Sequence, residues 1–131
     1  MNEMPPFDAL WFRILVGFLI GAALGSFSTM LAYRLPRHIS TVAPRSHCPS
    51  CGTTLQPRDL VPLFSWLLAR GRCRYCKASI GARYFIIEVA CSVAGAAACA
   101  AIGFTPSLIA ALALIVALVT GAGVALSRRQ P

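Results

Sequence analysis

Three long stretches almost free of charge dominate this sequence and limit what it can fold into. Residues 14–33 and 107–126 carry no charged side chain, and residues 84–103 carry one, Glu88. About twenty residues of α-helix cross the ~30 Å hydrocarbon core of a bilayer. The chain of 131 residues is 57% hydrophobic and 12% charged, so no polar domain is large enough to bury three such helices. The sequence therefore predicts an α-helical membrane protein with three transmembrane helices, at 12–33, 84–103 and 106–126.

Charges beside these runs predict their orientation. Nine of the twelve basic residues lie in the segment 34–83, and two more follow the last run. Basic residues concentrate on the cytoplasmic side of a membrane, so we expect residues 1–11 outside, and the loop 34–83 and the tail 127–131 in the cytoplasm. No basic region precedes the long first run, which favours an uncleaved anchor over a signal peptide. The net charge of +8 is then explained by topology and anionic lipid, without nucleic acid.

Four cysteines stand as two Cys-x-x-Cys pairs in the predicted cytoplasmic loop, Cys48 with Cys51 and Cys73 with Cys76. Structural disulfides are rare in a reducing compartment. Four thiolates form the tetrahedral sulfur set that Zn²⁺ prefers in closed structural sites. We therefore expect one structural zinc ion, with a redox pair or disulfide, or unligated thiols, as the alternatives.

The surroundings of the two pairs fit compact turns. Residues 52–72 separate them, 21 in all, slightly more than the usual spacing of about 15–20, so the intervening loop must be compact. Gly52 after the first pair is free to take a positive φ, whereas Lys77 stands at the matching position after the second. His47 is a neighbouring residue able to replace one ligand. Cys91 and Cys99 lie inside an apolar run and are expected to be packing residues.

The segment between the pairs predicts a short amphipathic helix near 60–70. Asp59 suits the N-cap, Pro62 the first turn and Gly71 the position after the helix end. Trp66 and five apolar residues follow at helical spacing: Leu60, Leu63, Phe64, Leu67 and Leu68. Two placements remain open, because such a helix can lie against the bilayer surface or form the small core of a zinc ribbon.

Two features of the apolar runs carry further hypotheses. Gly17, Gly21 and Gly25 form a ridge on one face of the first run, which lets another helix approach closely. We expect this face to pack against a membrane partner. Glu88, a carboxylate within a span, is a candidate catalytic residue by default, with an ion pair to Arg83 or Arg34 as the alternative.

Several motifs in order resemble one family. "GSF" at 25–27, "RLP" at 34–36, "CPSC", "DLVPLFSWL", "RGRCRYC" and "ARYFIIE" ending at Glu88 are similar to the N-terminal module of type 4 prepilin leader peptidases and N-methyltransferases. The resemblance covers about residues 17 to 92. One departure is Phe85, where the family usually has a proline, and it bears on where the second span begins.

The resemblance implies a bacterial inner-membrane enzyme. Such an enzyme removes the basic leader of type 4 prepilins and pseudopilins at the cytoplasmic side and methylates the new N-terminal amine with S-adenosylmethionine. It also implies that the two cysteine pairs hold zinc. Glu88 would accept the proton of the pilin ammonium, or bind that cation.

The peptidase chemistry of the family needs two aspartates, one of them in a Gly-x-Gly-Asp motif, so that one carboxylate activates water while the other polarises the peptide carbonyl. The sequence contains two aspartates, Asp8 and Asp59, and no such motif. We therefore expect a separate aspartyl peptidase subunit as partner. Three readings stay open: a methyl-transferring or substrate-handling half of the system, a non-catalytic zinc-bearing docking subunit, and a vestigial truncated peptidase.

Overall fold

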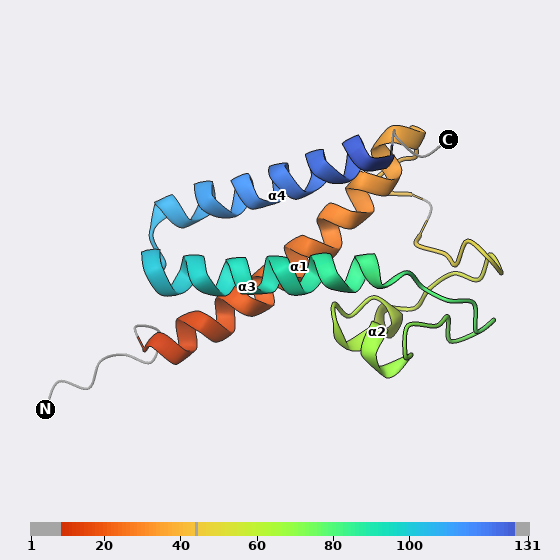
Figure 1. The fold of residues 1–131 in the computed structure, drawn as a ribbon, viewed down its shortest axis with the longest axis horizontal. Helices are drawn as coiled ribbons and strands as arrows, with labels where there is room; N and C mark the ends of the chain where they lie inside the picture. Colours follow the sequence, from red (N-terminus) through yellow and green to blue (C-terminus); the bar gives the residue numbers. More distant parts are fainter. Residues whose placement is uncertain (1–8, 44, 128–131) are drawn as a thin grey trace, which may run out of the picture.

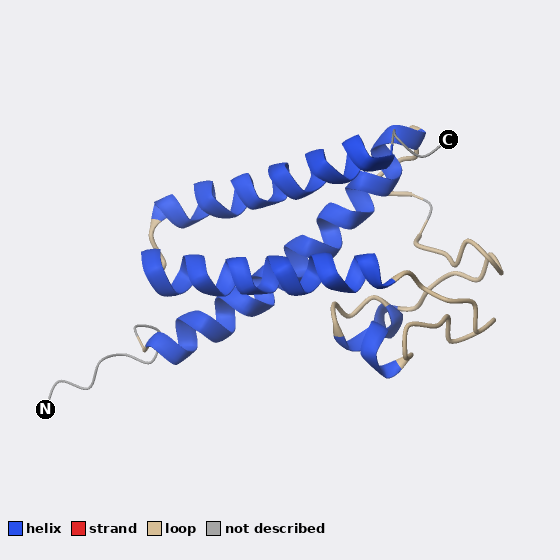
Figure 2. Cartoon of the chain, in the orientation of Figure 1, coloured by secondary structure: helices blue, strands red, loops and turns tan. Residues whose placement is uncertain are grey.

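The computed structural model describes residues 9–43 and 45–127, and these form a helical protein with a looped extension at one end (Figures 1 and 2). Two 3-10 turns and four helices follow in the order α1 Leu10–Arg34, η2 Leu35–Arg37, η3 Pro57–Asp59, α2 Phe64–Leu68, α3 Ala82–Ile102 and α4 Pro106–Ser127. Within the described residues, strand pairing is limited to two isolated bridges. The predicted fold class is confirmed.

Three helices are long and apolar enough to span a membrane, α1 continued by η2, α3 and α4. They start and end within a few residues of the predicted spans. The external N-terminus and the cytoplasmic tail were predicted for residues that lie largely outside the described ranges, at 1–8 and 128–131. The spans make this chain a membrane protein.

The core of the molecule is the crossing of α1 and α3 (Figure 1). Both helices contribute small residues, which lets the backbones approach closely. The side of α1 that faces α3 carries the three ridge glycines. The buried residues of α3 on the facing side are Cys91, Ser92, Gly95 and Cys99. A Cβ on Gly25 would lie 2.9 Å from the Cβ of Cys91, and one on Gly17 would meet the carbonyl oxygen of Gly95.

This packing corrects one expectation. The glycine ridge was expected to face a separate membrane partner, but α3 of the same chain covers it. The sequence pattern identified a close-packing face correctly and could not identify which helix fills it. Cys91 and Cys99 are packing residues, as predicted, with 2% and 0% of their surface exposed.

Polar groups within this core are satisfied locally. The hydroxyl groups of Ser28 and Thr29 donate to the carbonyl oxygens of Leu24 and Ser26, both at 2.8 Å. Ser92 donates to the carbonyl of Glu88 at 2.7 Å. These bonds to the preceding turn allow hydroxyl side chains inside an apolar helix pair.

Helix α4 packs more loosely. It follows the turn at Gly103, whose φ of +70° suits a residue without a Cβ, and it begins at Pro106, a favoured residue for a first turn. It returns beside α1, where a Cβ on Gly123 would lie 2.6 Å from that of Ala32. Only 6% of its most apolar stretch is buried within the chain, against 33% for α1, so most of the apolar surface of α4 is uncovered by the described residues.

Candidate metal centre

The loop between α1 and α3 folds as two turns of the same design, one around each cysteine pair. In the first, the N–H of Cys48 donates to the carbonyl of Thr53 (3.0 Å) and that of Gly52 donates to the carbonyl of Cys48 (2.8 Å). In the second, the N–H of Cys73 donates to Ala78 (2.8 Å) and that of Lys77 to Cys73 (3.0 Å). Isolated bridges, His47 with Thr54 and Arg72 with Ser79, close each turn.

Both turns need a left-handed residue after the second cysteine. Gly52 has a φ of +69° and Lys77 a φ of +63°. A glycine adopts this conformation at no steric cost, whereas a lysine is strained in it. The second turn therefore contains backbone strain at Lys77 that the first turn, with Gly52, does not have.

The two turns bring all four sulfur atoms together, within 4.8 Å of one another. A zinc ion with Zn–S bonds of about 2.3 Å needs tetrahedral S···S edges of about 3.8 Å, and the Sγ atoms of Cys48 and Cys76 are 3.8 Å apart. All six cysteines are free thiols. The four sulfur atoms can hold a metal ion, and the set is consistent with zinc.

Backbone N–H groups stabilise the thiolate form of two ligands. The N–H groups of Cys51 and Ser50 lower the pKa of the Cys48 thiol, and those of Cys76 and Tyr75 lower the pKa of Cys73 in the same way. The hydroxyl and then the N–H of Thr53 lower the pKa of the Cys51 thiol, whose Sγ lies 3.3 Å from that hydroxyl oxygen.

Cys76 behaves differently. The N–H of Ala78 alone would lower the pKa of its thiol, but burial and the three neighbouring cysteines outweigh it and raise the pKa to about 11. Four thiolates cannot gather without a cation, because each new negative charge is repelled by the others. A metal ion bound among the four sulfur atoms would relieve this repulsion.

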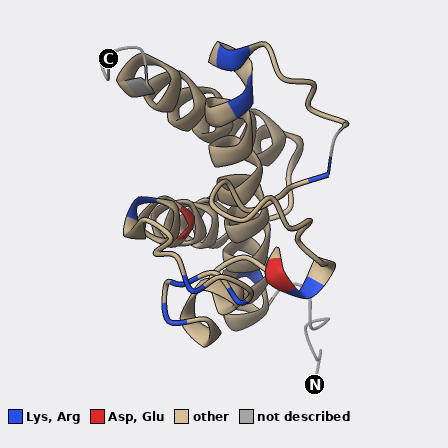
Figure 3. Cartoon of the chain, turned by 90° about the vertical axis from the view of Figure 1, so that its right-hand side faces the viewer, with Lys and Arg blue, Asp and Glu red and all other residues tan. Residues whose placement is uncertain are grey.

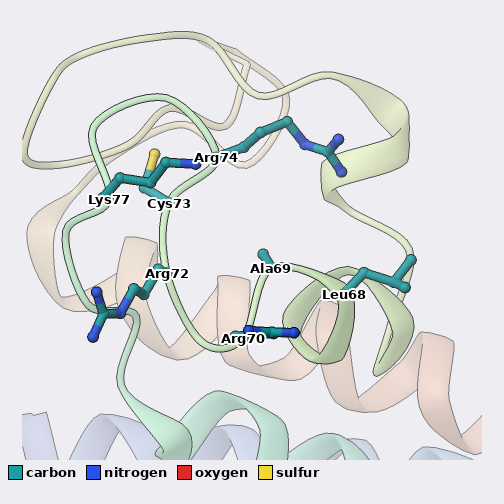
Figure 4. A pocket seen from close by; sticks show the side chains of 7 residues that line it. All are labelled: Leu68, Ala69, Arg70, Arg72, Cys73, Arg74 and Lys77. Carbon is teal, nitrogen blue, oxygen red and sulfur yellow. The ribbon is translucent and has the colours of Figure 1, made fainter.

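Most of the Lys and Arg positions lie toward the loop end of the molecule (Figure 3). Beside Cys73 lies a cavity of about 850 Å³, drawn in Figure 4, which is lined by Leu68, Ala69, Arg70, Arg72, Cys73, Arg74 and Lys77. The positive charges of Arg70, Arg72, Arg74 and Lys77 would offset the double negative charge of a zinc ion bound by four thiolates. Arg74 is also held by Asp59, at 2.9 Å.

Asp59 does not cap the helix, contrary to prediction. It ends the 3-10 turn η3, and its carboxylate accepts hydrogen bonds from the N–H of Gln56 (3.1 Å), from Arg74 (2.9 Å) and from the Tyr75 hydroxyl (3.1 Å). Burial alone would raise the pKa of Asp59, but these donors together lower it. Asp59 thus ties η3 to the second cysteine turn, a contact between distant residues with no local sequence signal.

Helix α2 is also shorter than predicted, because the backbone is not helical at Leu63. This residue has a φ of +62°, so the helix runs only from Phe64 to Leu68. The position after the cap residue Ala69 is held by Arg70, with a φ of +52°, and not by Gly71 as predicted; Gly71 comes next, with a φ of +65°. A Cβ on Gly71 would lie 2.8 Å from the Trp66 ring. Leu63 is 7% exposed, while Leu60, Phe64, Leu67 and Leu68 remain between 45% and 79% exposed, so most of this set forms no ribbon core.

The remaining candidate residues occupy other places. His47 is not part of the sulfur cluster, and its Nδ1 lies 3.4 Å from the carbonyl oxygen of Arg45. Phe85 lies inside α3, which begins at Ala82, and its ring stacks on Trp66 with centroids 4.7 Å apart. Within the described residues, the Glu88 carboxylate is bound by neither predicted arginine: its Oε2 accepts a hydrogen bond from the N–H of Leu63 at 2.8 Å.

Comparison with known proteins agrees with the resemblance in the motifs. Residues 19–102 match the family described as the Bacterial Peptidase A24 N-terminal domain. The chain is 38% identical over 118 residues to the prepilin leader peptidase/N-methyltransferase of Myxococcus xanthus, covering 90% of this chain and 35% of that protein. It is 38% identical over 98 residues to the protein of the same name from Bacillus subtilis, covering 75% and 40%.

A third relative, of that same name from Burkholderia pseudomallei, is 43% identical over 84 residues, covering 64% of this chain and 27% of the relative. The chain thus spans roughly a third of the length of these relatives. No solved structure matches it significantly.

Proposed function

Because the chain belongs to the family of bacterial peptidase A24 N-terminal domains, we propose that it is the zinc-bearing membrane module of a type 4 prepilin-processing system. This system removes the prepilin leader and methylates the new N-terminus. One observation carries the proposal: the family match at residues 19–102 spans both the sulfur cluster and the α1–α3 crossing on which it stands. The relatives named for this activity support it.

We propose zinc as the metal, held by Cys48, Cys51, Cys73 and Cys76. Four protein sulfur ligands leave no open coordination position, so the ion stabilises the loop and does not activate water. The loop has little apolar core of its own, which makes its fold dependent on the metal.

The setting that we propose is the bacterial inner membrane, with the thiol loop and the C-terminal end of α4 in the cytoplasm. The strong excess of basic residues between α1 and α3 supports this orientation. In this placement the loop meets the basic leader of a prepilin on the same side of the membrane, and the spans can receive the apolar segment that follows it.

For the chemistry, we propose that a unit with two aspartates cleaves the prepilin while this module orients it and supports methyl transfer from S-adenosylmethionine. The partner unit and the methyl donor are inferred from the family resemblance. A direct role for Glu88 as acceptor of the ammonium proton stays a prediction. Its carboxylate already accepts a hydrogen bond from the N–H of Leu63.

The test is reconstitution in proteoliposomes with a prepilin, S-adenosylmethionine and an aspartyl prepilin peptidase unit, each omitted in turn. Mass spectrometry of the pilin N-terminus distinguishes leader removal from methylation. We expect both products only when module and peptidase unit are together, and loss of both with Cys73→Ser. Cys99→Ala is the control, since Cys99 is buried away from the cluster.

Other outcomes assign other functions. Cleavage without methylation, together with co-purification of the two units, would identify a docking subunit. Full cleavage and methylation by the peptidase unit alone, with no binding to this chain, would overturn the proposal.

A further inference from the structure

One hydrogen bond joins the membrane-spanning frame to the thiol loop, between the Glu88 carboxylate of α3 and the N–H of Leu63. Glu88 lies six residues after Ala82, the first residue of α3, or about 9 Å along the helix at 1.5 Å per residue. A loop residue therefore reaches down beside the second turn of a transmembrane helix. Its positive φ aims a buried N–H at that carboxylate.

A second pair of contacts fixes the next turn of the loop. The Trp66 ring stacks on Phe85, at 4.7 Å between centroids and 19° between planes. The indole N–H donates to the carbonyl of Ile80 at 3.3 Å. With Leu63 held at Glu88, these contacts place α2 alongside the first two turns of α3.

The outer surface of α2 is apolar and uncovered within the described chain. Phe64 is 56% exposed, Leu67 52% and Leu68 79%. On α3, Ile86 is 63% exposed. An uncovered apolar surface on α2 therefore lies near the first turns of a helix that is long and apolar enough to span a membrane.

Charge changes sharply at the end of α2. The cavity beside it is lined by Leu68 and by four basic residues, Arg70, Arg72, Arg74 and Lys77 (Figure 4). Arg70, Arg72 and Lys77 form no ion pair with a carboxylate of the described residues. An apolar turn bordered by cations is the composition of helices that lie at the boundary between acyl chains and phosphates.

We propose that α2 is an interfacial helix seated at the edge of the bilayer, and that Glu88 is the positioning residue that fixes its depth. The occupant of the apolar surface is lipid, because the contacts to Glu88 and Phe85 hold α2 beside the first turns of a spanning helix and basic residues border its end. The hydrogen bond to Leu63 also explains a carboxylate within a span, since it sits where a loop N–H enters the membrane edge. This proposal is independent of prepilin processing.

Tryptophan fluorescence tests the depth. The chain has two tryptophans, so Trp11→Phe leaves Trp66 alone as a probe on α2. In proteoliposomes, we expect lipids brominated near the headgroup to quench Trp66 about twofold more than lipids brominated at the chain end, and aqueous iodide to quench it little. Strong iodide quenching with no effect of brominated lipid would overturn the interfacial placement.

Substitutions of Glu88 test the positioning role in the same Trp11→Phe background. Glu88→Ala removes the acceptor, so Trp66 should lose about half of its quenching by lipid and gain quenching by iodide. Glu88→Gln keeps an oxygen acceptor without the charge and should restore most of the original pattern. Metal content, measured for each variant, controls for a folded loop. Unchanged quenching in folded Glu88→Ala, or a Gln variant that behaves like Ala, would overturn the positioning role.

Leu68→Asp tests the occupant. It should move the α2 probe toward water, while Val42→Asp, at a loop residue 89% exposed, should leave Trp66 unchanged. If the surface instead receives an apolar peptide, brominated lipid will quench Trp66 weakly and an added pilin segment will shield it from iodide. That result would replace lipid as the occupant.

Discussion

Lys77 is the residue where the second cysteine turn departs from the first. Its φ of +63° costs a residue with a side chain about 1 kcal/mol relative to glycine. We expect Lys77→Gly to raise the resistance of the loop to unfolding by about this amount, measured as the shift in thermal midpoint of the metal-loaded protein.

The matched control is Lys77→Ala, which removes the same charge but keeps a Cβ in the strained conformation. It should stabilise little or not at all. Equal stabilisation by Gly and Ala would mean that the lysine charge, and not the backbone, limits the turn.

Asp59 supports a pH-dependent contact between η3 and the second turn. Its donors lower the pKa of the carboxyl, so its stabilising effect is present above the ordinary pKa of about 3.9 and is lost as the pH falls through the lowered value. At neutral pH, Asp59→Asn should speed limited proteolysis of the loop about threefold, in keeping with a partly exposed ion pair.

At acidic pH the same variant should lose this difference from the wild-type chain. Arg58→Gln, a neighbouring exposed residue, is the control for a change in loop charge. A difference for Asp59→Asn that is independent of pH would contradict the role of the ionised carboxylate.

The four clustered cysteines could be predicted residue by residue as a possible metal site, because their spacing and the chemistry of sulfur are local properties. The positive φ at Gly52 was predictable for the same reason. The partners of Asp59 and Glu88 were not, since Arg74 is 15 residues and Leu63 25 residues away, and no periodicity in the sequence connects them. For Asp59 a tertiary contact replaces the predicted capping role, whereas the catalytic role of Glu88 stays a prediction.

Among the elements, the crossing of α1 and α3 depends on backbone contact. A side chain on Gly21 would meet the carbonyl of Cys91 on α3, so it cannot be accommodated without separating the helices. We expect Gly21→Leu to destabilise the folded protein by about 2 kcal/mol or more. Thermal unfolding in mild detergent provides the measurement.

Gly121→Leu is the control, because no atom lies within 4 Å of the position of a Cβ there. It adds the same side chain to α4 and should leave stability nearly unchanged. Equal stability of the two variants would show that α1 does not pack on α3 through its glycines.

The spanning helices followed from apolar length, and their bounds from charges and glycines at their ends. The sequence predicted α2 less well. Leucines at helical spacing between 60 and 70 indicate a helix of three turns. However, Leu63, whose N–H donates to Glu88, has a positive φ, so the helix begins only at Phe64. Tertiary contacts thus override local propensity in α2, the shortest α-helix among the described residues.

For the whole molecule, the orientation in the membrane is a prediction that labelling can check. Protease-sensitive tags at Val42, in the loop, and at Thr105, in the turn between α3 and α4, should lie on opposite sides. In spheroplasts, where an added protease reaches the outer face of the inner membrane, we expect the tag at Thr105 to be cleaved and the tag at Val42 only after lysis, because basic residues favour the cytoplasm. Cleavage at Val42 in intact spheroplasts would reverse the proposed topology.

The paired cysteine turns also determine the effective length of the connection between α1 and α3. From Leu35 to Gly81 the connection is about 47 residues long, but a metal that joins Cys48 to Cys76 bypasses the middle and leaves about 20. A shorter connection raises the effective concentration of one helix for the other, worth about 0.8 kcal/mol by loop entropy. Metal loading and the assembly of the two spans are then a single thermodynamic cycle, in which each event makes the other more favourable.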